Sequence, residues 1–320
     1  MGKLAFVFPG QGSQYVGMGK SLYDGYTAAR EVYDLCSDNE LSVNGLSDNE
    51  LSVSETIKIS WEGPKEEQTA TNIAQPAIFM ADLAAAFSLN SALNKGGITV
   101  AGAAGFSLGE VPALAFSGLL DLKESFNFVR FRAKAMHLCT QENRGGMMAV
   151  MGLSEETVEG ACASVEGAYP VNYNAPGQIV VAHQADASDK LKAAITSAKG
   201  KVMPLPVAGA FHSPMMDKAA EKISAYLADI KFGEMTIPLY ANVTGKLYDT
   251  KDPKKLLATQ VNSPVRWQGT IEQMIADGYD TFIETGPGKT LTGMIKKIDK
   301  NVRTFNVFDA ESLEAVLAEF

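Results

Sequence analysis

The sequence predicts an α/β protein with a large domain built on a mainly parallel sheet and a smaller domain inserted into it. Short apolar runs alternate with longer stretches of helical periodicity along the 320 residues, as in a parallel sheet whose strands are joined by helices. Between positions 146 and 205 the order becomes strand, helix, strand, strand, helix, strand, the split βαβ or ferredoxin-like unit. We therefore expect the inserted domain at 144–206 and the large domain at 1–143 and 207–320.

The first part of the large domain contains two predicted strands and one clearly marked helix. The segments Lys3–Phe8 and Ile98–Phe106 are short and apolar, as buried strands are. Asp121 and Glu124 form a capping box ahead of apolar residues spaced three and four apart. This pattern predicts a helix that starts at Asp121.

The remaining elements follow from the same kinds of pattern. In the insertion we expect helices from Ser154 and Ala187 and strands at 147–153, 169–174, 178–183 and 201–206. After the insertion we expect strands at 238–241 and 281–284, and helices from Pro214, from Pro253, from Trp267 and up to Phe320.

The chain also contains a short internal duplication. The heptapeptide Ser37–Val43 recurs as Ser47–Val53. Two copies of this length are too few to stack as a solenoid. We interpret them as a duplicated, solvent-exposed connection and assign them no function.

Composition and charge exclude several classes of protein. Hydrophobic residues make up 46% of the chain and charged residues 20%, so it is neither a disordered chain nor a coiled coil. The net charge is −9, so binding to nucleic acid or to anionic lipid would need a local basic patch. We expect no nucleic-acid partner.

The sequence further predicts a cytoplasmic protein. Its three cysteines, Cys36, Cys139 and Cys162, form no C-x-x-C pair, which indicates neither a disulfide framework nor a zinc site. The apolar stretch before Pro9 is too short for a signal peptide, and no run of about 18 apolar residues occurs. We expect no membrane association and no metal.

The strongest chemical signal is the G-x-S-x-G motif at 105–109 (GFSLG). It lies between a predicted strand and a predicted helix, where glycines on both sides of the serine permit a sharp turn that exposes the hydroxyl group. Ser107 is therefore the candidate nucleophile. The alternative is a serine in an ordinary glycine turn, because the motif alone also occurs by chance.

A serine hydroxyl needs a base to remove its proton, and histidine is the usual one. Of the three histidines, His137 lies on the helix from Asp121 and His183 ends a predicted strand of the insertion. His212 lies on the loop that returns to the large domain, just before a helix, and functional residues concentrate on such loops. His212 is therefore the candidate base.

Two glycine-rich segments look like nucleotide-binding loops but do not match them. The segment Pro9–Gln14 is followed by Tyr15, where a dinucleotide fingerprint needs its third glycine. The segment Gly286–Thr290 has Ile283 upstream, where a phosphate loop needs its first glycine. Neither motif predicts a nucleotide site.

The first glycine-rich turn fits an acyl-transfer site better than a nucleotide site. An oxyanion hole takes one backbone N–H from the residue after the nucleophile, here Leu108, and a second from a separate loop. Gln11, in the turn after the first strand, is suited to the second position.

Eight segments closely resemble malonyl-CoA:acyl carrier protein transacylases, in the order found in that family. They are FVFPGQGSQ (6–14), GFSLGE (105–110), RAKAMH (132–137), NAPGQIVVA (174–182), GAFHSPMM (209–216), ANVTG (241–245), NSPVRW (262–267) and ETGPGKTLTG (284–293). The resemblance spans the chain except for residues 37 to about 59. It implies an α/β-hydrolase-like large domain with a ferredoxin-like insertion, in agreement with the pattern of elements.

The resemblance implies a role for each matching residue. Ser107 accepts the acyl group and His212 acts as the base, while the amides of Gln11 and Leu108 form the oxyanion hole. Arg132 binds the malonyl carboxylate, for which a guanidinium is well shaped because it can hold a carboxylate through two hydrogen bonds. Helical periodicity alone does not choose between Arg130 and Arg132, and either could be a surface arginine.

Further roles are implied around these residues. The backbone carbonyl of Gln260 orients the base, and Asn174 lines the acyl or pantetheine channel. Phe211, together with Leu108, resembles the malonyl-selective rather than the methylmalonyl-selective members. The chain departs from the family at Phe106, where most members have histidine; we expect activity to survive this change, with altered packing near the thioester.

The implied activity is an acyltransferase reaction, the transfer of a malonyl group from malonyl-CoA to holo-acyl carrier protein for fatty-acid synthesis, with no bound cofactor. We expect a monomer. Carrier proteins are acidic, so a local basic surface is expected near the active site. Its candidate residues, which could equally be scattered solvated lysines, are Lys199, Lys201, Lys289, Lys296 and Lys297.

Three other functions stay open. The same transferase could serve a polyketide synthase. A thioesterase or esterase would use water as the acceptor and would need an acid between serine and histidine in chain order, where Asp186 and Asp189 lie at the start of a predicted helix. An inactive scaffold that binds carrier protein would fit better if Ser107, His212 or Arg132 were missing.

Overall fold

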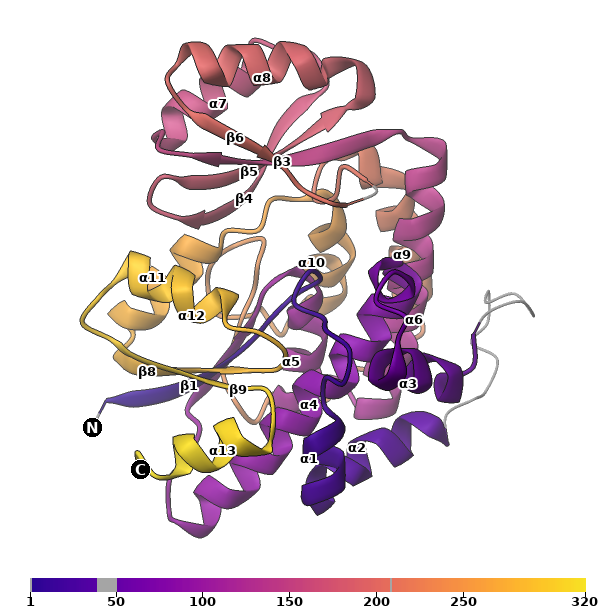
Figure 1. The fold of residues 1–320 in the computed structure, drawn as a ribbon, viewed down its shortest axis with the longest axis vertical. Helices are drawn as coiled ribbons and strands as arrows, with labels where there is room; N and C mark the ends of the chain where they lie inside the picture. Colours follow the sequence, from indigo (N-terminus) through magenta and orange to yellow (C-terminus); the bar gives the residue numbers. More distant parts are fainter. Residues whose placement is uncertain (1, 39–50, 208) are drawn as a thin grey trace. The chain divides into compact units, whose positions relative to one another are not determined.

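The computed structural model describes residues 2–38, 51–207 and 209–320, and Figure 1 shows the order of the elements. These residues group into two compact units. The first comprises Met1–Lys134, Ile230–Ala241 and Met274–Phe320, and the second comprises Ala135–Asp229 and Asn242–Gln273. The second unit includes all of the predicted insertion and continues beyond it on both sides, while the predicted boundaries at 143/144 and 206/207 stay a prediction.

The first unit is built on a five-stranded parallel sheet in the order β7-β2-β1-β8-β9. Its strands are β1 (Lys3–Phe8), β2 (Gly102–Gly105), β7 (Leu239–Tyr240), β8 (Tyr279–Thr285) and β9 (Arg303–Val307). Because the strands are parallel, the chain leaves β1, β2 and β8 at the same edge of the sheet, where open α/β sheets place their ligands.

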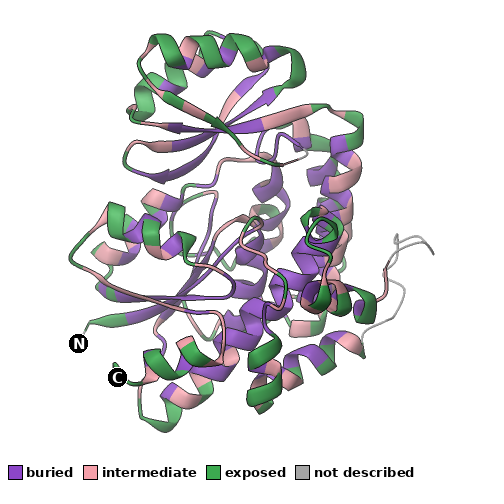
Figure 2. Cartoon of the chain, viewed as in Figure 1, coloured by how far each residue is buried: buried purple, intermediate pink, exposed green. Residues whose placement is uncertain are grey.

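The core helix of this unit is α4 (Thr71–Lys95). Its apolar residues lie on all sides, and Figure 2 shows it buried along most of its length. By length and composition it could cross a membrane, but 78% of the relevant window is buried inside the protein. A helix that is apolar all round and buried in this way is a core helix.

The other helices of the first unit surround the sheet and α4. They are α1 (Lys20–Gly25), α2 (Thr27–Ser37), α3 (Val53–Glu62), α5 (Glu110–Ser117), α12 (Thr290–Ile298) and α13 (Ala310–Leu317), with a short 3₁₀ turn, η1, at Glu67–Thr69. The predicted helix from Asp121 is confirmed as α6 (Leu122–Glu142), which runs on into the second unit. The carboxylate of Asp121 accepts hydrogen bonds from the backbone amides of Lys123 and Glu124.

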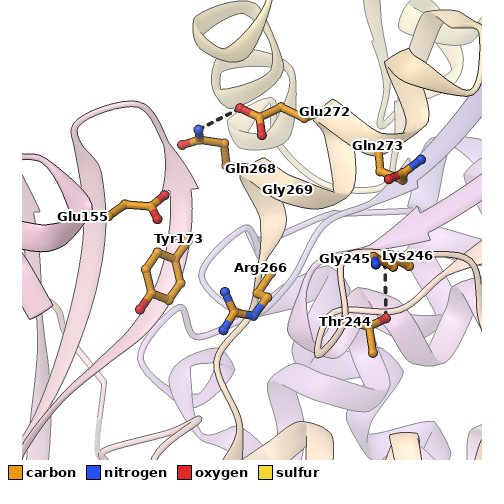
Figure 3. Close-up of a pocket in the computed structure, with 10 residues that line it drawn as sticks. All are labelled: Glu155, Tyr173, Thr244, Gly245, Lys246, Arg266, Gln268, Gly269, Glu272 and Gln273. Carbon is orange, nitrogen blue, oxygen red and sulfur yellow. Dashed lines mark hydrogen bonds between the residues drawn. The ribbon is translucent and has the colours of Figure 1, made fainter.

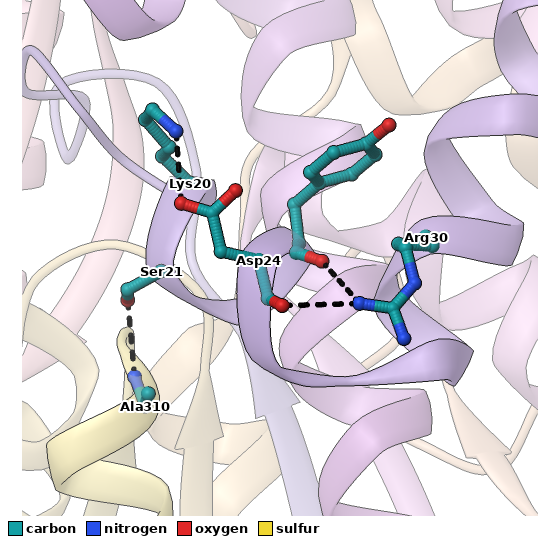
Figure 4. Close-up of polar contacts among 6 residues, drawn as sticks. Lys20, Ser21, Asp24, Arg30 and Ala310 are labelled. Carbon is teal, nitrogen blue, oxygen red and sulfur yellow. Dashed lines mark hydrogen bonds and ion pairs between the residues drawn. The ribbon is translucent and has the colours of Figure 1, made fainter.

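Polar contacts fix the turn between α1 and α2 (Figure 4). Arg30 donates from one guanidinium nitrogen to the carbonyl oxygens of Tyr23 and Asp24, at 3.1 Å each, and so satisfies carbonyls at the end of α1. Ser21 accepts a hydrogen bond from the backbone amide of Ala310. The hydrogen bond between Ser21 and Ala310 connects α1 with α13.

The second unit contains a four-stranded antiparallel sheet in the order β4-β5-β3-β6. Its elements are β3 (Gly145–Met151), α7 (Glu155–Ala163), β4 (Ala168–Ala175), β5 (Gln178–Gln184), α8 (Ser188–Ser197) and β6 (Lys201–Pro204), with the 3₁₀ turn η3 at Ala185–Ala187. The first strand lies between the third and fourth of this run, so the predicted βαββαβ unit is confirmed. Apolar side chains of α7 and α8 pack with the sheet into one core, which includes Val158, Leu191 and Ile195.

The rest of the second unit is helical. It contains α9 (Asp217–Leu227), α10 (Pro253–Thr259) and most of α11 (Trp267–Ala276), with 3₁₀ turns η4 (Pro214–Met216) and η5 (Gln260–Asn262). These agree with the helices predicted from Pro214, Pro253 and Trp267. The repeat at 37–53 falls mostly on residues 39–50, outside the described residues.

Two predictions about the parallel sheet need correction. The strand expected at Ile98–Phe106 is only Gly102–Gly105, because the chain joins the hydrogen-bonded ladder at the amide of Ala101 and leaves it at the turn after Gly105. The region after β8 was expected to be entirely helical, but Arg303–Val307 forms the edge strand β9. Its residues are mostly half-buried, so the continuous apolar run of an interior strand is missing there.

Candidate active site

The G-x-S-x-G motif forms a sharp turn between β2 and α5. Phe106 is still extended, Ser107 has a left-handed backbone with φ of 52°, and the 3₁₀ turn η2 (Ser107–Gly109) leads into α5. Among the described residues, only Ser107, Lys199 and His212 have positive φ without being glycine. Strained backbone of this kind concentrates at functional sites, and here it falls on the predicted nucleophile and the predicted base.

Close backbone packing explains the glycines of this turn. A β-carbon at Gly105 would overlap the backbone of Gly109, and a β-carbon at Gly109 would overlap the carbonyl of Phe8 at the end of β1. The motif therefore lies directly against the carboxyl end of the central strand.

We expect Gly109→Ala to lower the free energy of unfolding by about 2–4 kcal/mol, because the added methyl group meets backbone that cannot move aside. Gly293→Ala is the matched control, since nothing lies within 4 Å of its β-carbon position on α12. This control should be neutral or stabilising by up to about 1 kcal/mol. Denaturant unfolding of both variants measures the difference, and equal stabilities would contradict the packing argument.

Arg132 lies on α6 and is almost fully buried, with 1% of its surface exposed. It donates one hydrogen bond to Oε1 of Gln75 on α4 at 2.8 Å and another to Oγ of Ser107 at 3.3 Å. Burial lowers the pKa of Arg132 to about 10, while the nearby buried carboxylate of Glu110 acts to raise it. The guanidinium is therefore charged at neutral pH and lies beside Ser107, the predicted nucleophile.

These contacts answer a question that helical periodicity left open. Arg130 is only half-buried, whereas Arg132 is buried and contacts Ser107. Sequence reasoning assigned no role to Gln75 or Glu110. Glu110 is the last residue of the segment GFSLGE, whereas Gln75 lies in none of the eight segments and only its contact with Arg132 marks it.

The loop after β1 passes beside the turn that carries Ser107. The amide of Phe106 donates to the carbonyl of Phe8 at 2.9 Å, and a β-carbon at Gly10 would lie 2.5 Å from the carbonyl oxygen of Phe106. Gln11 follows Gly10 and donates through its side-chain amide to Thr71 at the start of α4. Leu108 is buried next to Ser107. Both predicted oxyanion residues thus belong to the same unit as Ser107.

His212 lies in the second unit and is 3% exposed. Its Nδ1 is 2.9 Å from the carbonyl oxygen of Gln260, and its backbone amide donates to the carbonyl of Val261, also at 2.9 Å. Because a carbonyl oxygen can only accept, Nδ1 carries a proton, and in the neutral imidazole the lone pair is on Nε2. The backbone carbonyl that contacts His212 belongs to Gln260, the residue that the resemblance indicates.

Comparison with known proteins agrees with this arrangement. The acyl transferase domain family matches residues 5–313 of the chain. The malonyl CoA-acyl carrier protein transacylase of Bacillus subtilis is 35% identical over 324 residues, which cover 99% of this chain and 97% of that protein. The chain belongs to the malonyl CoA-acyl carrier protein transacylase family.

Solved structures of this transacylase family have the same fold. The crystal structure from Clostridium perfringens has a TM-score of 0.89 at 36% identity and covers 99% of this chain and 96% of its own. A malonyl-transacylase solved in complex with a type II PKS acyl-carrier protein has a TM-score of 0.88 at 32% identity, covering 99% and 100%. The predicted α/β fold with a separate smaller domain is confirmed.

The other predicted transacylase residues lie in the second unit. Asn174 on β4 and Phe211, which precedes His212, are both buried. Oδ1 of Asn174 has no hydrogen-bond partner within the described residues. The other two histidines form hydrogen bonds with residues close in sequence. His137 is hydrogen-bonded to Gln141 on the same helix, and His183 donates to the carbonyl of Gln184.

The predicted docking lysines are all exposed. Lys199 and Lys201 belong to the second unit, and Lys289, Lys296 and Lys297 belong to the first. Their joint role in binding a transacylase partner stays a prediction.

One cavity of the second unit contains none of the predicted residues (Figure 3). It encloses about 280 Å³ beside the start of α11 and has both acidic and basic groups in its wall, including Glu155, Lys246 and Glu272. The guanidinium of Arg266 lies over the ring of Tyr173, 5.5 Å from its centroid. The transacylase site described above does not use this cavity.

Proposed function

We propose that the protein transfers the malonyl group of malonyl-CoA to the phosphopantetheine thiol of holo-acyl carrier protein, through a malonyl ester of Ser107, and so supplies fatty-acid elongation. The observation that carries this proposal is the buried guanidinium of Arg132 at 3.3 Å from Oγ of Ser107. A malonyl thioester has its carboxylate one methylene from the carbonyl that is attacked. A fixed cation beside the nucleophile favours an acyl group that carries a carboxylate over a neutral acyl group.

In the first half-reaction, Nε2 of His212 takes the proton from Ser107 while Oγ attacks the thioester carbonyl. The negative charge on the carbonyl oxygen is held by the backbone amides of Gln11 and Leu108. The carbon–sulfur bond then breaks, and His212 returns the proton to the sulfur of the departing coenzyme A.

In the second half-reaction, the phosphopantetheine thiol gives its proton to His212 and its sulfur attacks the malonyl ester. The same two amides hold the oxyanion, the ester bond to Ser107 breaks, and the serine oxygen regains the proton from His212. The enzyme is restored without a bound cofactor or metal, and the sequence of steps is ping-pong.

The second unit contributes selectivity in this proposal. Asn174, with its unpartnered buried Oδ1, is a hydrogen-bond acceptor for the amide groups of pantetheine. Phe211 limits the room for a branch on the α-carbon of the acyl group, a discrimination worth about 1–3 kcal/mol for one methyl group.

We expect Phe106→His to change kcat for malonyl transfer by less than about fivefold, because the residue at this position packs near the thioester and does not move the proton. Steady-state kinetics with malonyl-CoA and carrier protein measure the effect. A gain of a hundredfold or more would show instead that the phenylalanine at this position limits the reaction.

The proposed partner is an acidic carrier protein, bound through exposed lysines near the active site. We propose that the enzyme is cytoplasmic and monomeric, and that it associates with neither nucleic acid nor membrane. Selectivity between carrier proteins separates the fatty-acid role from its nearest alternative, a stand-alone acyltransferase of a polyketide synthase. The observation in favour of this alternative is the malonyl-transacylase that was solved in complex with a type II PKS acyl-carrier protein.

A serine thioesterase or esterase is the second alternative, and it predicts fast release of the acyl group to water. We expect malonyl-Ser107 to be hydrolysed at least about a hundredfold more slowly than it reacts with holo-acyl carrier protein. Decay of the isolated malonyl-enzyme, followed by mass spectrometry with and without carrier protein, tests this. Equal decay would favour the hydrolase.

A further inference from the structure

Asp82 is a fully buried acid on α4 that the proposed mechanism does not use. None of its surface is exposed, and neither carboxyl oxygen has a hydrogen-bond partner in the described part of the chain. An isolated buried carboxylate is very costly, so such a group normally keeps its proton. A group of this kind in the core of an enzyme needs an explanation.

The groups around Asp82 favour its neutral form. Glu284, at the end of β8, lies close enough to act on its charge, and Tyr33 of α2 is the other titratable group that faces it. Burial, reinforced by the charge of Glu284, holds the pKa of Asp82 well above its usual range.

Burial raises the pKa of Glu284 as well, but hydrogen bonds stabilise the negative charge on Glu284 and not on Asp82. The carboxylate of Glu284 accepts hydrogen bonds from the backbone amides of Leu291 and Thr292 and from the hydroxyl of Thr292, at 2.7–3.1 Å. These donors lie in the first turn of α12, where a carboxylate is stabilised. The proton of the pair therefore belongs to Asp82.

Asp82 lies under the loops at the active-site edge of the parallel sheet. The space that a β-carbon would take at Gly286 is filled by the Asp82 carboxyl group and lies 2.9 Å from Cγ of Pro9. Gly286 begins the turn after β8 with φ of 133°, and a β-carbon at Gly288 of the same turn would lie 3.7 Å from Cβ of Ser13. The carboxyl group thus contacts a turn that packs along the loop from Pro9 to Ser13, which carries the Gln11 amide.

We propose that Asp82, as the neutral acid, is a positioning residue for the oxyanion hole: it supports the Gly286 turn and through it the loop that presents the amide of Gln11. The proposal rests on the proposed function, because it assumes that this amide binds the oxyanion. Since that contact forms fully only in the transition state, loss of the support lowers kcat and leaves KM nearly unchanged.

The test compares Asp82→Asn, which keeps the shape without a charge, with Asp82→Ala, which removes the contact. We expect Asp82→Asn to keep kcat for malonyl transfer within about threefold, and Asp82→Ala to lower it at least about tenfold with KM for malonyl-CoA within about twofold. Ser88→Ala is the control, because Ser88 is also buried on α4 with an unpartnered hydroxyl, while the atoms nearest to the β-carbon position of Gly286 belong to Asp82 and Pro9. Unchanged kcat in Asp82→Ala, or an equal loss in Ser88→Ala, would overturn the proposal.

A second measurement tests the protonation state without relying on activity. If Asp82 takes up a proton on folding, the wild type loses stability as the pH rises from the unfolded-state pKa of about 4 to the folded-state pKa. Asp82→Asn lacks this titration. Its folding equilibrium constant, divided by that of the wild type, therefore increases about tenfold per pH unit in that range. Denaturant unfolding between pH 5 and pH 8 measures this slope. A constant difference would show that Asp82 is ionised and would overturn the proposal, even if Asp82→Ala fails to fold.

Failure of the proposed function gives a different result. In that case the wild-type enzyme itself forms no malonyl ester on Ser107, whereas failure of the Asp82 proposal leaves the wild-type ester intact.

Discussion

Replacing Ser107 with alanine is expected to abolish the malonyl-enzyme and to lower kcat for malonyl transfer by at least about 10⁴-fold. The large effect follows from covalent catalysis, because without Oγ there is no acyl acceptor and the remaining groups stabilise an intermediate that cannot form. Alanine keeps the β-carbon of serine, so the left-handed backbone at Ser107 is about as strained as before and the fold should be kept. Peptide mass spectrometry after brief incubation with malonyl-CoA measures the adduct, and steady-state kinetics measure the rate.

The control for this variant is Ser164→Ala. Ser164 is an exposed serine at the end of α7 whose hydroxyl donates only to the carbonyl of Ala161. It should keep both the adduct and the rate. An adduct of wild-type yield at another residue in Ser107→Ala would show that the nucleophile lies elsewhere.

Replacing Arg132 with alanine is expected to separate malonyl from acetyl transfer. Removing one partner of a buried, hydrogen-bonded ion pair costs about 2–5 kcal/mol, so kcat/KM for malonyl-CoA should fall by about 30-fold to 4000-fold. The acetyl group of acetyl-CoA has no carboxylate for Arg132 to bind. Its kcat/KM should therefore fall much less. The ratio of the two values is the measurement.

Arg130→Ala is the matched control for Arg132. Arg130 lies on the same helix but is only half-buried, whereas Arg132 is buried and donates to Ser107 and Gln75. Arg130→Ala should change kcat/KM for both substrates by less than about threefold, because no carboxylate of the substrate is assigned to Arg130. Equal losses on malonyl-CoA and acetyl-CoA in Arg132→Ala would contradict the carboxylate clamp.

The same arginine predicts a pH effect. Since burial lowers its pKa to about 10, the guanidinium loses its proton as the pH rises through about 10, and the clamp is present below that pH. KM for malonyl-CoA should therefore rise above about pH 9.5, while KM for acetyl-CoA stays flat. Parallel curves for the two substrates would argue against the assignment.

Much of the site could be predicted because its signals are local. The turn at Ser107 depends on Gly105 and Gly109, whose absent side chains leave space for neighbouring backbone, and glycine on both sides of a serine marks such a turn in any sequence. The βαββαβ unit follows from its alternating strands and from the Ser154 cap, which the structure confirms.

Other features depend on tertiary packing that no local pattern records. The helix α4 is apolar on every side, so it has no stripe from which to infer a buried face. The strand β9 is an edge strand with mixed polarity, and only its pairing with β8 defines it. Helical periodicity does not choose between Arg130 and Arg132, because both flank the apolar face of α6 at similar angles; the resemblance selects Arg132, and only tertiary packing shows its contact with Ser107.

The central claim is a malonyl group that passes from coenzyme A to Ser107 and then to a carrier thiol. Intact-protein and peptide mass spectrometry after brief incubation with malonyl-CoA, and again after addition of holo-acyl carrier protein, tests it most directly. We predict one malonyl adduct on the peptide that contains Ser107, followed by its transfer to the carrier protein. An adduct lost to water at the same rate with or without carrier protein, or no adduct at all, would contradict the account.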